Sequence, residues 1–112
     1  MAAIKTYEQI ILDVLQAEKI ERSADQVQDL VLADKESRHY QLLRTGWETK
    51  EYFINKIIFH FHISDNGKIW LLANNTDIQI TDELIKRGVP ISDIVLGFHP
   101  EKYRAVLGFA VA

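Results

Sequence analysis

The chain of 112 residues contains no cysteine. This absence excludes disulfide bonds, thiolate catalysis and metal sites with cysteine ligands. The apolar runs are only a few residues long, whereas a membrane-spanning helix needs about 20 apolar residues. The first residues also lack the basic and then apolar order of a secretion signal. We therefore expect a single cytoplasmic domain, residues 1–112, that does not contact a membrane.

Motifs that carry enzymatic chemistry are missing as well. The chain has no HExxH zinc motif, no EF-hand loop and no glycine-rich phosphate loop, and its serines lie in turn-like segments without a nucleophile elbow. Asp65-Asn66-Gly67 predicts a tight hairpin turn rather than a calcium loop, because the later bidentate glutamate of such loops is absent. These absences predict a protein that is not an enzyme and holds no cofactor.

Positive charge is scarce too. The chain carries 16 acidic and 13 basic residues, for a net charge of −3, and its isoelectric point is about 5.8, whereas a DNA-binding domain usually presents a basic face. Residues 1–36 hold four basic and eight acidic residues, and residues 37–63 hold four basic and two acidic ones. Direct DNA binding is therefore an alternative that needs a face assembled from dispersed cations. These cations are Arg38, Arg44, Lys50, Lys56 and Lys68.

The pattern of apolar residues predicts one helix followed by several strands. Apolar residues at helical spacing from Ile4 to Leu15 predict a helix over residues 4–19, and Ser23-Ala24-Asp25 predicts a break after it. Turn residues at 34–37 separate two runs rich in aliphatic residues. The strands are expected over residues 27–33, 38–45 (ended by Gly46), 51–63 and 68–73.

The third of these strands has two distinct faces, because side chains alternate along a strand. At 13 residues it exceeds the usual length of about 5–6, which predicts a bend or a later start. The face expected in the core carries Phe53, Ile57, Phe59, Phe61 and Ile63. The opposite face is expected to carry Tyr52, Ile54, Lys56, Ile58, His60 and His62.

The last third of the chain predicts short helices. Ile80, Leu84 and Ile85 share a helical face, and Gly88 followed by Pro90 ends it. Residues 91–93 predict a second short helical turn, and the small apolar residues 105–112 predict a packed C-terminal segment. The chain thus predicts an α+β fold, an antiparallel sheet of about four strands with an N-terminal helix and a short C-terminal helical region packed on one face. The other face would expose Tyr52, Ile54 and Ile58, which predicts a homodimer or higher oligomer.

Two histidines suggest a metal site. His60 and His62 project from the same face of the third strand, and a third ligand from His39 or His99 would let them bind zinc or copper. A small metal-dependent enzyme is therefore a second alternative. The plainer interpretation is a pair of half-exposed histidines on a sheet face, or an interface, and we expect no tight stoichiometric metal.

His99 and Arg104 form a second candidate cluster near the C-terminus. A histidine and an arginine together are able to bind phosphate or carboxylate, and the plainer interpretation is a buried turn whose arginine satisfies backbone carbonyls. Trp47 and Trp70 are large amphipathic anchors of a core or an interface. The candidate interaction residues are Trp47, Tyr52, Ile54, Ile58, His60, His62, Trp70, His99 and Arg104.

Several spaced segments resemble one known family. They are Tyr40-Gln41-Leu42-Leu43, Gly46-Trp47, Gly67-Lys68-Ile69-Trp70, Gly88-Val89-Pro90, Asp93-Ile94-Val95-Leu96-Gly97-Phe98-His99 and Phe109-Ala110-Val111-Ala112. In this order they resemble the XisI family, small cyanobacterial proteins named as controlling factors for excision of a nitrogen-fixation DNA element. The resemblance covers about residues 34–112. The chain departs from the family pattern at Val106-Leu107-Gly108, where the family tends to have Tyr-Thr before Phe-Ala.

The resemblance implies a non-catalytic accessory role. XisI-like proteins are associated with a larger companion, XisH, which looks nuclease-like in fold, and with control of a site-specific recombinase. The resemblance therefore implies an XisH-like companion as the direct partner, the recombinase as a further partner, and contact with DNA only through them.

Overall fold

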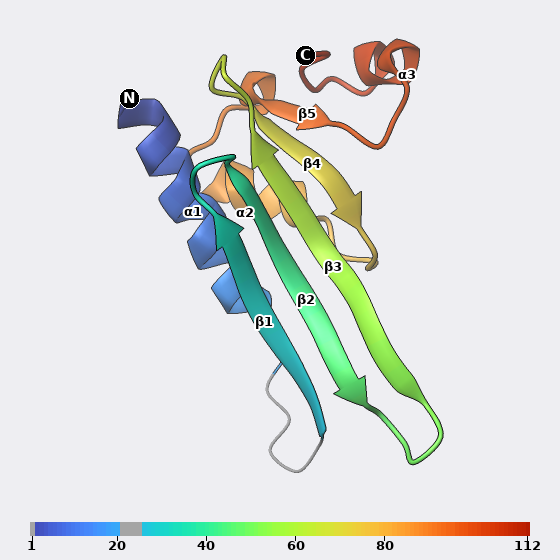
Figure 1. The fold of residues 1–112 in the computed structure, drawn as a ribbon. Helices are drawn as coiled ribbons and strands as arrows, with labels where there is room; N and C mark the ends of the chain where they lie inside the picture. Colours follow the sequence, from blue (N-terminus) through green and yellow to red (C-terminus); the bar gives the residue numbers. More distant parts are fainter. Residues whose placement is uncertain (1, 21–25) are drawn as a thin grey trace.

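The computed structural model describes residues 2–20 and 26–112, and within them one helix is followed by a five-stranded sheet with short helices near its end (Figure 1). The break expected at residues 23–25 lies outside the described residues. The elements are α1 (Ala2–Glu18), β1 (Gln26–Asp34), β2 (His39–Trp47), β3 (Phe53–Ile63), β4 (Ile69–Asn74), α2 (Ile80–Lys86), the short 3-10 helix η1 (Ile91–Asp93), β5 (Ile94–Leu96) and α3 (Glu101–Val106).

The sheet follows the order of the sequence, β1-β2-β3-β4-β5. The first four strands pair antiparallel, so the α+β class and the antiparallel sheet are confirmed. The fifth strand is an addition to the expected four, and it pairs parallel to β4. A parallel pair needs a crossover connection, and α2 provides it. Within the described residues no helix combines the length and the apolar character that a membrane crossing requires.

The core lies between one face of the sheet and the two helices α1 and α2. Apolar residues of α1 and α2 pack against alternate residues of β2, β3, β4 and β5, and Figure 1 shows both helices behind the same side of the sheet. We call this side the covered face. Its fully buried members include Ile11, Leu15, Tyr40, Leu42, Phe59, Phe61, Ile63, Ile69, Ile80, Leu84 and Ile94.

Two tyrosine hydroxyls tie α1 to the rest of the molecule. Tyr7 donates a hydrogen bond to Asp93 of η1, and Tyr40 of β2 donates to the Glu8 carboxylate at 2.6 Å. Burial, with the bond to Asp93, raises the pKa of Tyr7 to about 12. Both hydroxyls therefore remain protonated donors at neutral pH, and they fix α1 along the sheet.

A β-bulge in β3 decides which residues reach the core. Leu42 of β2 faces Phe59 whereas Leu43 faces Ile57, so Ile58 is the extra residue on β3. Ile58 and Phe59 are consecutive and yet both buried, at 2% and 1% exposure. A bulge inverts the alternation of side chains on either side of it, so residues before it and after it follow opposite parities.

The bulge makes part of the expected face assignment wrong. Ile54 and Ile58 belong to the core, with 8% and 2% exposure, whereas Phe53 is 50% exposed and Ile57 lies on the opposite face. Tyr52 is 60% exposed and precedes β3. The assignment of residues 59–63 is right because these residues follow the bulge. Of the two expectations for this long strand, the later start is confirmed, because β3 begins at Phe53.

Gly46 does not end β2, contrary to expectation. It lies within the strand, opposite Val27 and Ile54, with φ of 136°. A Cβ atom at this position would lie 1.8 Å from the carbonyl oxygen of Gln26. A glycine is therefore required by the close approach of β1 and by the positive φ, and not by a turn.

Candidate interaction surface

β1, β2 and β3 have a second face that α1 and α2 leave uncovered. Figure 1 shows this side of the sheet toward the viewer, with both helices behind it. We call it the open face. The strand register places its side chains in five cross-strand rows, because residues directly opposite one another in paired strands point to the same side.

The rows run in order from the end of the sheet beside the β2–β3 turn to the end beside the β1–β2 turn. The aromatic row holds Gln26, Trp47 and Phe53, and the polar row holds Gln28, Thr45 and Asn55. The aliphatic row holds Leu30, Leu43 and Ile57, and the mixed row holds Leu32, Gln41 and His60. The histidine row holds Asp34, His39 and His62, and Trp70 of β4 continues it.

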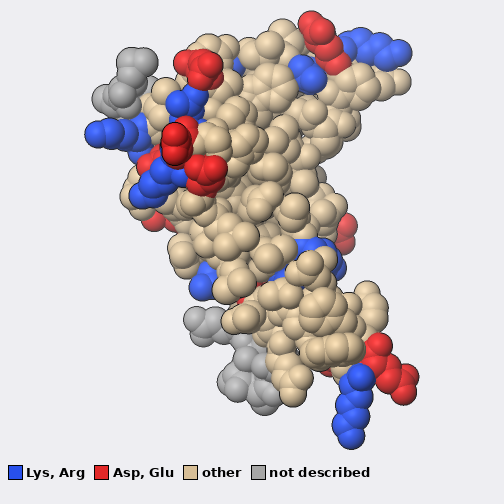
Figure 2. Space-filling model, viewed as in Figure 1, with Lys and Arg blue, Asp and Glu red and all other residues tan. Residues whose placement is uncertain are grey.

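The open face has almost no formal charge. None of its fifteen positions on β1, β2 and β3 is a lysine or arginine, and Asp34, at the last position of β1, is the one acidic residue. Figure 2, which shows this side, has most charged side chains at the two ends and the rim, around a broad surface of other residues. Trp47 and Phe53 remain about half exposed and contact each other with ring centroids 5.1 Å apart.

Three histidines from two strands meet in the last two rows. Nδ1 of His39 and Nε2 of His60 lie 2.9 Å apart, in a hydrogen bond that one of the two rings donates. The His39 and His62 rings stack, with centroids 4.1 Å apart and planes 19° apart. Nδ1 of His62 donates to the carbonyl oxygen of Arg38 at 2.9 Å. We call His39, His60 and His62 the histidine cluster.

The histidine cluster disfavours protonation. Burial lowers the pKa of His60, and the nearby His39 and His62 rings lower it further. Burial is also the largest cause of the lowered pKa of His39, with His62 adding to it and Asp34 opposing it. Hydrogen bonds from Ser37 lower the pKa of the Asp34 carboxyl. At neutral pH His39 and His60 are therefore uncharged, and Asp34 is ionised beside them.

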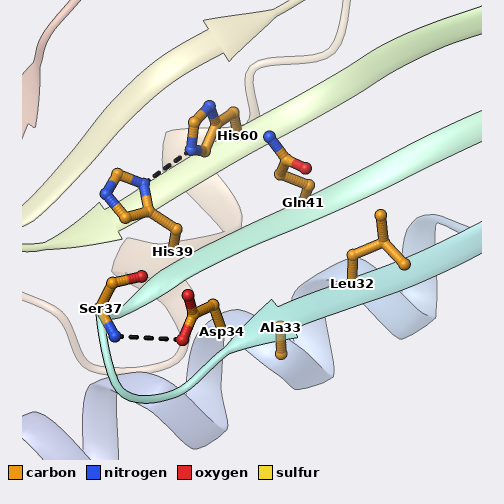
Figure 3. Close-up of a pocket in the computed structure, with 7 residues that line it drawn as sticks. All are labelled: Leu32, Ala33, Asp34, Ser37, His39, Gln41 and His60. Carbon is orange, nitrogen blue, oxygen red and sulfur yellow. Dashed lines mark hydrogen bonds between the residues drawn. The ribbon is translucent and has the colours of Figure 1, made fainter.

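A shallow hollow of about 450 Å³ lies beside the cluster. Figure 3 shows His39 and His60 joined by their hydrogen bond, with Gln41 beside them and Asp34 and Ser37 at the adjoining turn. Leu32 from β1 supplies an apolar wall. The hollow is open and mixed in character, so it presents hydrogen-bonding groups to a contacting surface rather than enclosing a small ligand.

Of the two residues considered as a third metal ligand, the structure brings His39 to the pair and not His99. His39 touches both His60 and His62, whereas His99 lines a separate hollow with Phe98 and Phe109. Across residues 2–20 and 26–112, no group of three or more His, Asp or Glu side chains is arranged to hold a metal ion. The stacking of His39 on His62 explains this, because the nitrogens of parallel rings do not converge on one point.

Arg104 acts as a clamp on the C-terminal segment. Its Nε donates to the carbonyl oxygen of His99 at 3.0 Å, and its Nη1 donates to that of Val111 at 2.7 Å. The guanidinium also lies 5.0 Å from the centroid of the Trp70 ring. Arg104 thus satisfies backbone carbonyls as the plainer interpretation expects, but the turn is not buried, since Phe98 is 48% exposed and α3 has no buried residue. Through the contact of Arg104 with Trp70, the C-terminal segment forms the edge of the open face at β4.

The arginines of the middle of the chain are engaged in ion pairs. Arg44 makes a bidentate pair with Asp29 on the covered face, with distances of 2.7 and 2.9 Å. The exposed side-chain fractions of these two residues are 14% and 2%. Arg38 donates to the carbonyl oxygen of Ile63 and pairs with Asp65. Arg44 is thus withdrawn from the surface that a DNA-binding face would need.

The nine candidate residues separate into distinct places. Trp47, His60, His62 and Trp70 share the open face, Tyr52 stands beside it in the β2–β3 turn, and His99 and Arg104 belong to the C-terminal segment. Ile54 and Ile58 are core residues. Five further residues of the open face were not among the candidates: Leu30, Leu32, Leu43, Phe53 and Ile57. The alternation along β1 alone would have been enough to predict Leu30 and Leu32.

Comparison with known proteins identifies relatives. A family model described as XisI protein matches residues 1–111. The chain is 33% identical to a XisI-like protein from Anabaena variabilis ATCC 29413, with a TM-score of 0.86 over 97% of this chain and 99% of the other. It is 29% identical to the fdxN element excision controlling factor XisI from the same organism, with a TM-score of 0.79 over 98% and 99% of the two chains. A search of curated proteins found no match.

The family model extends the resemblance noted from residue 34 onward to nearly the whole chain, including α1 and β1. The two solved structures share the fold over almost their full length. The chain therefore belongs to the XisI family.

Proposed function

We propose that this chain is a non-catalytic accessory protein that acts through protein contacts in the control of site-specific DNA excision. The similarity to a protein named as an excision controlling factor supports the process. In this proposal an XisH-like companion is the direct partner, and the companion connects the chain to the recombinase and to DNA.

The observation that carries a contact role is the composition of the open face. Five rows of side chains form an extended surface without a single lysine or arginine, and its aromatic row is half exposed. Large exposed apolar patches on folded proteins mark protein contacts, and aromatic residues dominate the energetics of such contacts.

The placement of charge argues against direct DNA binding. Duplex affinity depends on the number of phosphates that free cations neutralise. Arg44 is buried in its pair with Asp29, and Arg38 is paired with Asp65. Lys50 and Lys56 remain exposed, but Lys50 lies in the turn between β2 and β3 and Lys56 lies within β3, opposite Arg44. Lys68 follows β3 at the other end of the sheet, so these three lysines do not form a common basic face.

Reconstitution with a companion tests the proposal. Purified chain, an XisH-like protein and their mixture are examined by light scattering after size exclusion, and then by anisotropy with a labelled duplex at about 150 mM salt. We expect a complex of defined mass, and we expect no sub-micromolar duplex binding by the chain alone. The absence of any complex would contradict the companion as partner.

A charge-reversal variant distinguishes direct DNA binding from the proposed accessory role. Lys50→Glu/Lys56→Glu reverses two exposed cations without touching the core. If the chain alone binds duplex DNA below micromolar concentration, with a steep salt dependence that this variant abolishes, then direct DNA binding is its function and the proposal is wrong.

A further inference from the structure

The order of the five rows on the open face is nearly symmetric about its middle. The aliphatic row lies at the centre, the polar row and the mixed row flank it with two or three uncharged polar side chains each, and each end row holds two rings. We propose that two copies of this chain associate through their open faces, about a two-fold axis that lies in the interface and runs along the aliphatic row. The inference needs no companion protein and goes beyond the proposed function.

The lack of charge limits what this face is able to bind. A nucleic acid or a strongly charged protein surface needs complementary charges, and the fifteen positions offer only Asp34 at one corner. The occupant must instead present an apolar and uncharged surface of similar length. A second copy of the chain supplies such a surface without like-charge repulsion.

The two-fold axis pairs the rows with suitable partners. In an isologous dimer the same surface serves both copies, so the aliphatic row of one copy packs on the aliphatic row of the other. The polar row of Gln28, Thr45 and Asn55 then faces the mixed row, whose Gln41 and His60 offer hydrogen bonds. The aromatic row faces the histidine row, and ring packs on ring.

The face also has the dimensions of an interface. β3 has 11 residues, which corresponds to a length of about 36 Å at about 3.3 Å per residue, and three strands about 4.8 Å apart give a flat footprint of about 500 Å². The relief of the side chains and the contribution of the rim increase this value. A standard interface buries about 800 Å² on each partner, so the open face is of comparable size.

The histidine cluster gives the association a dependence on pH. The charged groups near the cluster are Asp34 on β1, Arg38 in the β1–β2 turn, whose guanidinium is directed to Ile63 and Asp65, and Arg104, which stacks on Trp70. Only Asp34 opposes positive charge on the histidines. Protonation of His39 and His60 would place two cationic rings with centroids 5.1 Å apart, under the aromatic row of the partner. The cost of desolvating these charges exceeds a cation–π gain of about 0.5–2 kcal/mol.

Thiol-specific cross-linking tests the arrangement directly, because the chain contains no cysteine. Leu43→Cys places one thiol at the centre of the aliphatic row, where it meets its own counterpart about 10 Å away across packed sheets. A short bismaleimide should therefore convert most of this variant to a covalent dimer. Trp47→Cys places the thiol two rows from the axis, so the two thiols lie roughly 27 Å apart and should remain unlinked.

Two control variants complete the cross-linking experiment. Val106→Cys carries its thiol on α3, where the side chain is 77% exposed, and it should not cross-link. A mixture of Trp47→Cys and His62→Cys chains should cross-link, because the axis brings the aromatic row onto the histidine row. Equal cross-linking of Trp47→Cys and Leu43→Cys would overturn the proposed axis.

Sedimentation of the unmodified chain decides whether the dimer exists. At about 50 µM and pH 7.5 we expect a species of twice the monomer mass of 12.9 kDa. Ile57→Lys should be monomeric with an unchanged circular dichroism spectrum, and the double variant Trp47→Ala/Phe53→Ala should weaken the dimer by at least about tenfold. A monomeric wild-type chain, or a dimer unaffected by both variants, would overturn the inference.

Two further measurements complete the test. Between pH 7.5 and pH 5.5 the dissociation constant of the wild-type dimer should rise by at least about tenfold, and His39→Gln/His60→Gln should reduce this change to less than about threefold.

If Ile57→Lys abolishes binding of an XisH-like companion while the wild-type chain alone stays monomeric, the face belongs to the companion and the assignment to a second copy is wrong. If the companion still binds the Ile57→Lys monomer, the proposed accessory role does not depend on the dimer. The experiment therefore distinguishes failure of the dimer proposal from failure of the accessory role.

Discussion

The two faces of one sheet follow opposite rules. The covered face buries apolar side chains under α1 and α2, and it also holds the ion pair of Asp29 and Arg44. The open face exposes aromatic and aliphatic side chains and carries no cation on β1, β2 or β3. The packed face thus holds an ion pair, whereas the uncovered face is largely apolar. In a globular protein whose faces contact only solvent or its own core, we expect ion pairs on the exposed face and apolar side chains on the packed one.

This contrast depends on one extra residue in β3. Without the bulge at Ile58, strict alternation would place Phe53 and Ile57 in the core and Ile54 on the surface. With the bulge, the core receives a continuous set of side chains and the open face receives the aromatic and aliphatic rows. The bulge therefore places apolar residues on a surface, as the proposed contact role requires.

The largest effect is expected from a comparison of two neighbouring isoleucines. Ile58→Ala should lower the free energy of unfolding by about 2–5 kcal/mol, because Ile58 is buried at the bulge. Ile57→Ala should cost less than about 1 kcal/mol in dilute solution, because its side chain lies on the open face. Urea unfolding of both variants measures the difference. Equal losses, or a larger loss for Ile57→Ala, would restore strict alternation and remove the basis of the contrast.

The next effect concerns charge on the covered face. Asp29→Asn should destabilise the fold by about 3 kcal/mol, because it leaves the Arg44 guanidinium, with 14% of its side chain exposed, without its carboxylate. It also weakens the acceptor of the Ile20 backbone N–H, which lies 2.8 Å from Asp29. The control is Asp65→Asn, since Asp65 is fully exposed in its pair with Arg38, and we expect no measurable change there. Similar unfolding midpoints for the two variants would show that the covered face does not depend on this pair.

A smaller effect is expected at the boundary of the open face. Arg104→Ala should reduce stability by about 1–2 kcal/mol through loss of two hydrogen bonds to backbone carbonyls and of the contact with Trp70. In a Trp47→Phe background, where Trp70 is the remaining tryptophan, the fluorescence emission should shift to longer wavelength as the ring becomes exposed. Lys102→Ala, on the same helix but over the Tyr103 ring, should leave the emission unchanged. An unshifted emission in Arg104→Ala would show that the clamp does not cover Trp70.

Much of the fold could be predicted from local patterns. The helical spacing of α1, the turn residues after β1 and the Asn-Gly hairpin between β3 and β4 each act within a few residues, and all three were located correctly. β5 was missed because three residues are too few for a periodic signal. The bulge was missed because it depends on how β2 and β3 align, which is a contact between segments about fifteen residues apart.

The candidate site shows the same limit. His60 and His62 were placed on one face correctly, because both follow the bulge. His39 lies next to them because of the register between β2 and β3. This register cannot be predicted from the sequence of either strand alone. The role of Arg104 was one of two stated interpretations, and the carbonyl oxygens of His99 and Val111 decide between them.

The smallest effect is a dependence of monomer stability on pH, which we expect from the histidine cluster of the open face. Burial and neighbouring rings lower the pKa of His39 and of His60, whereas an unfolded histidine has a pKa near 6.5. Below about pH 6.5 the unfolded chain therefore binds more protons than the folded one. The free energy of unfolding falls as the pH decreases through this value, and the loss levels off below the lowered pKa values of the folded state.

The contribution of Asp34 does not interfere, because its lowered pKa adds stability that disappears only in more acidic solution, below about pH 4. Urea midpoints of the dilute monomer at pH 7.5 and pH 5.5 measure the effect, and His60→Gln should reduce the difference between them. Asn55→Gln, which lies on the same face two rows away and keeps all three histidines, should retain the wild-type difference. A midpoint that rises on acidification, or a His60→Gln variant with the full wild-type difference, would mean that the histidine cluster is not held in its neutral form by the fold. The contrast between the open face and the covered face would then be one of packing alone.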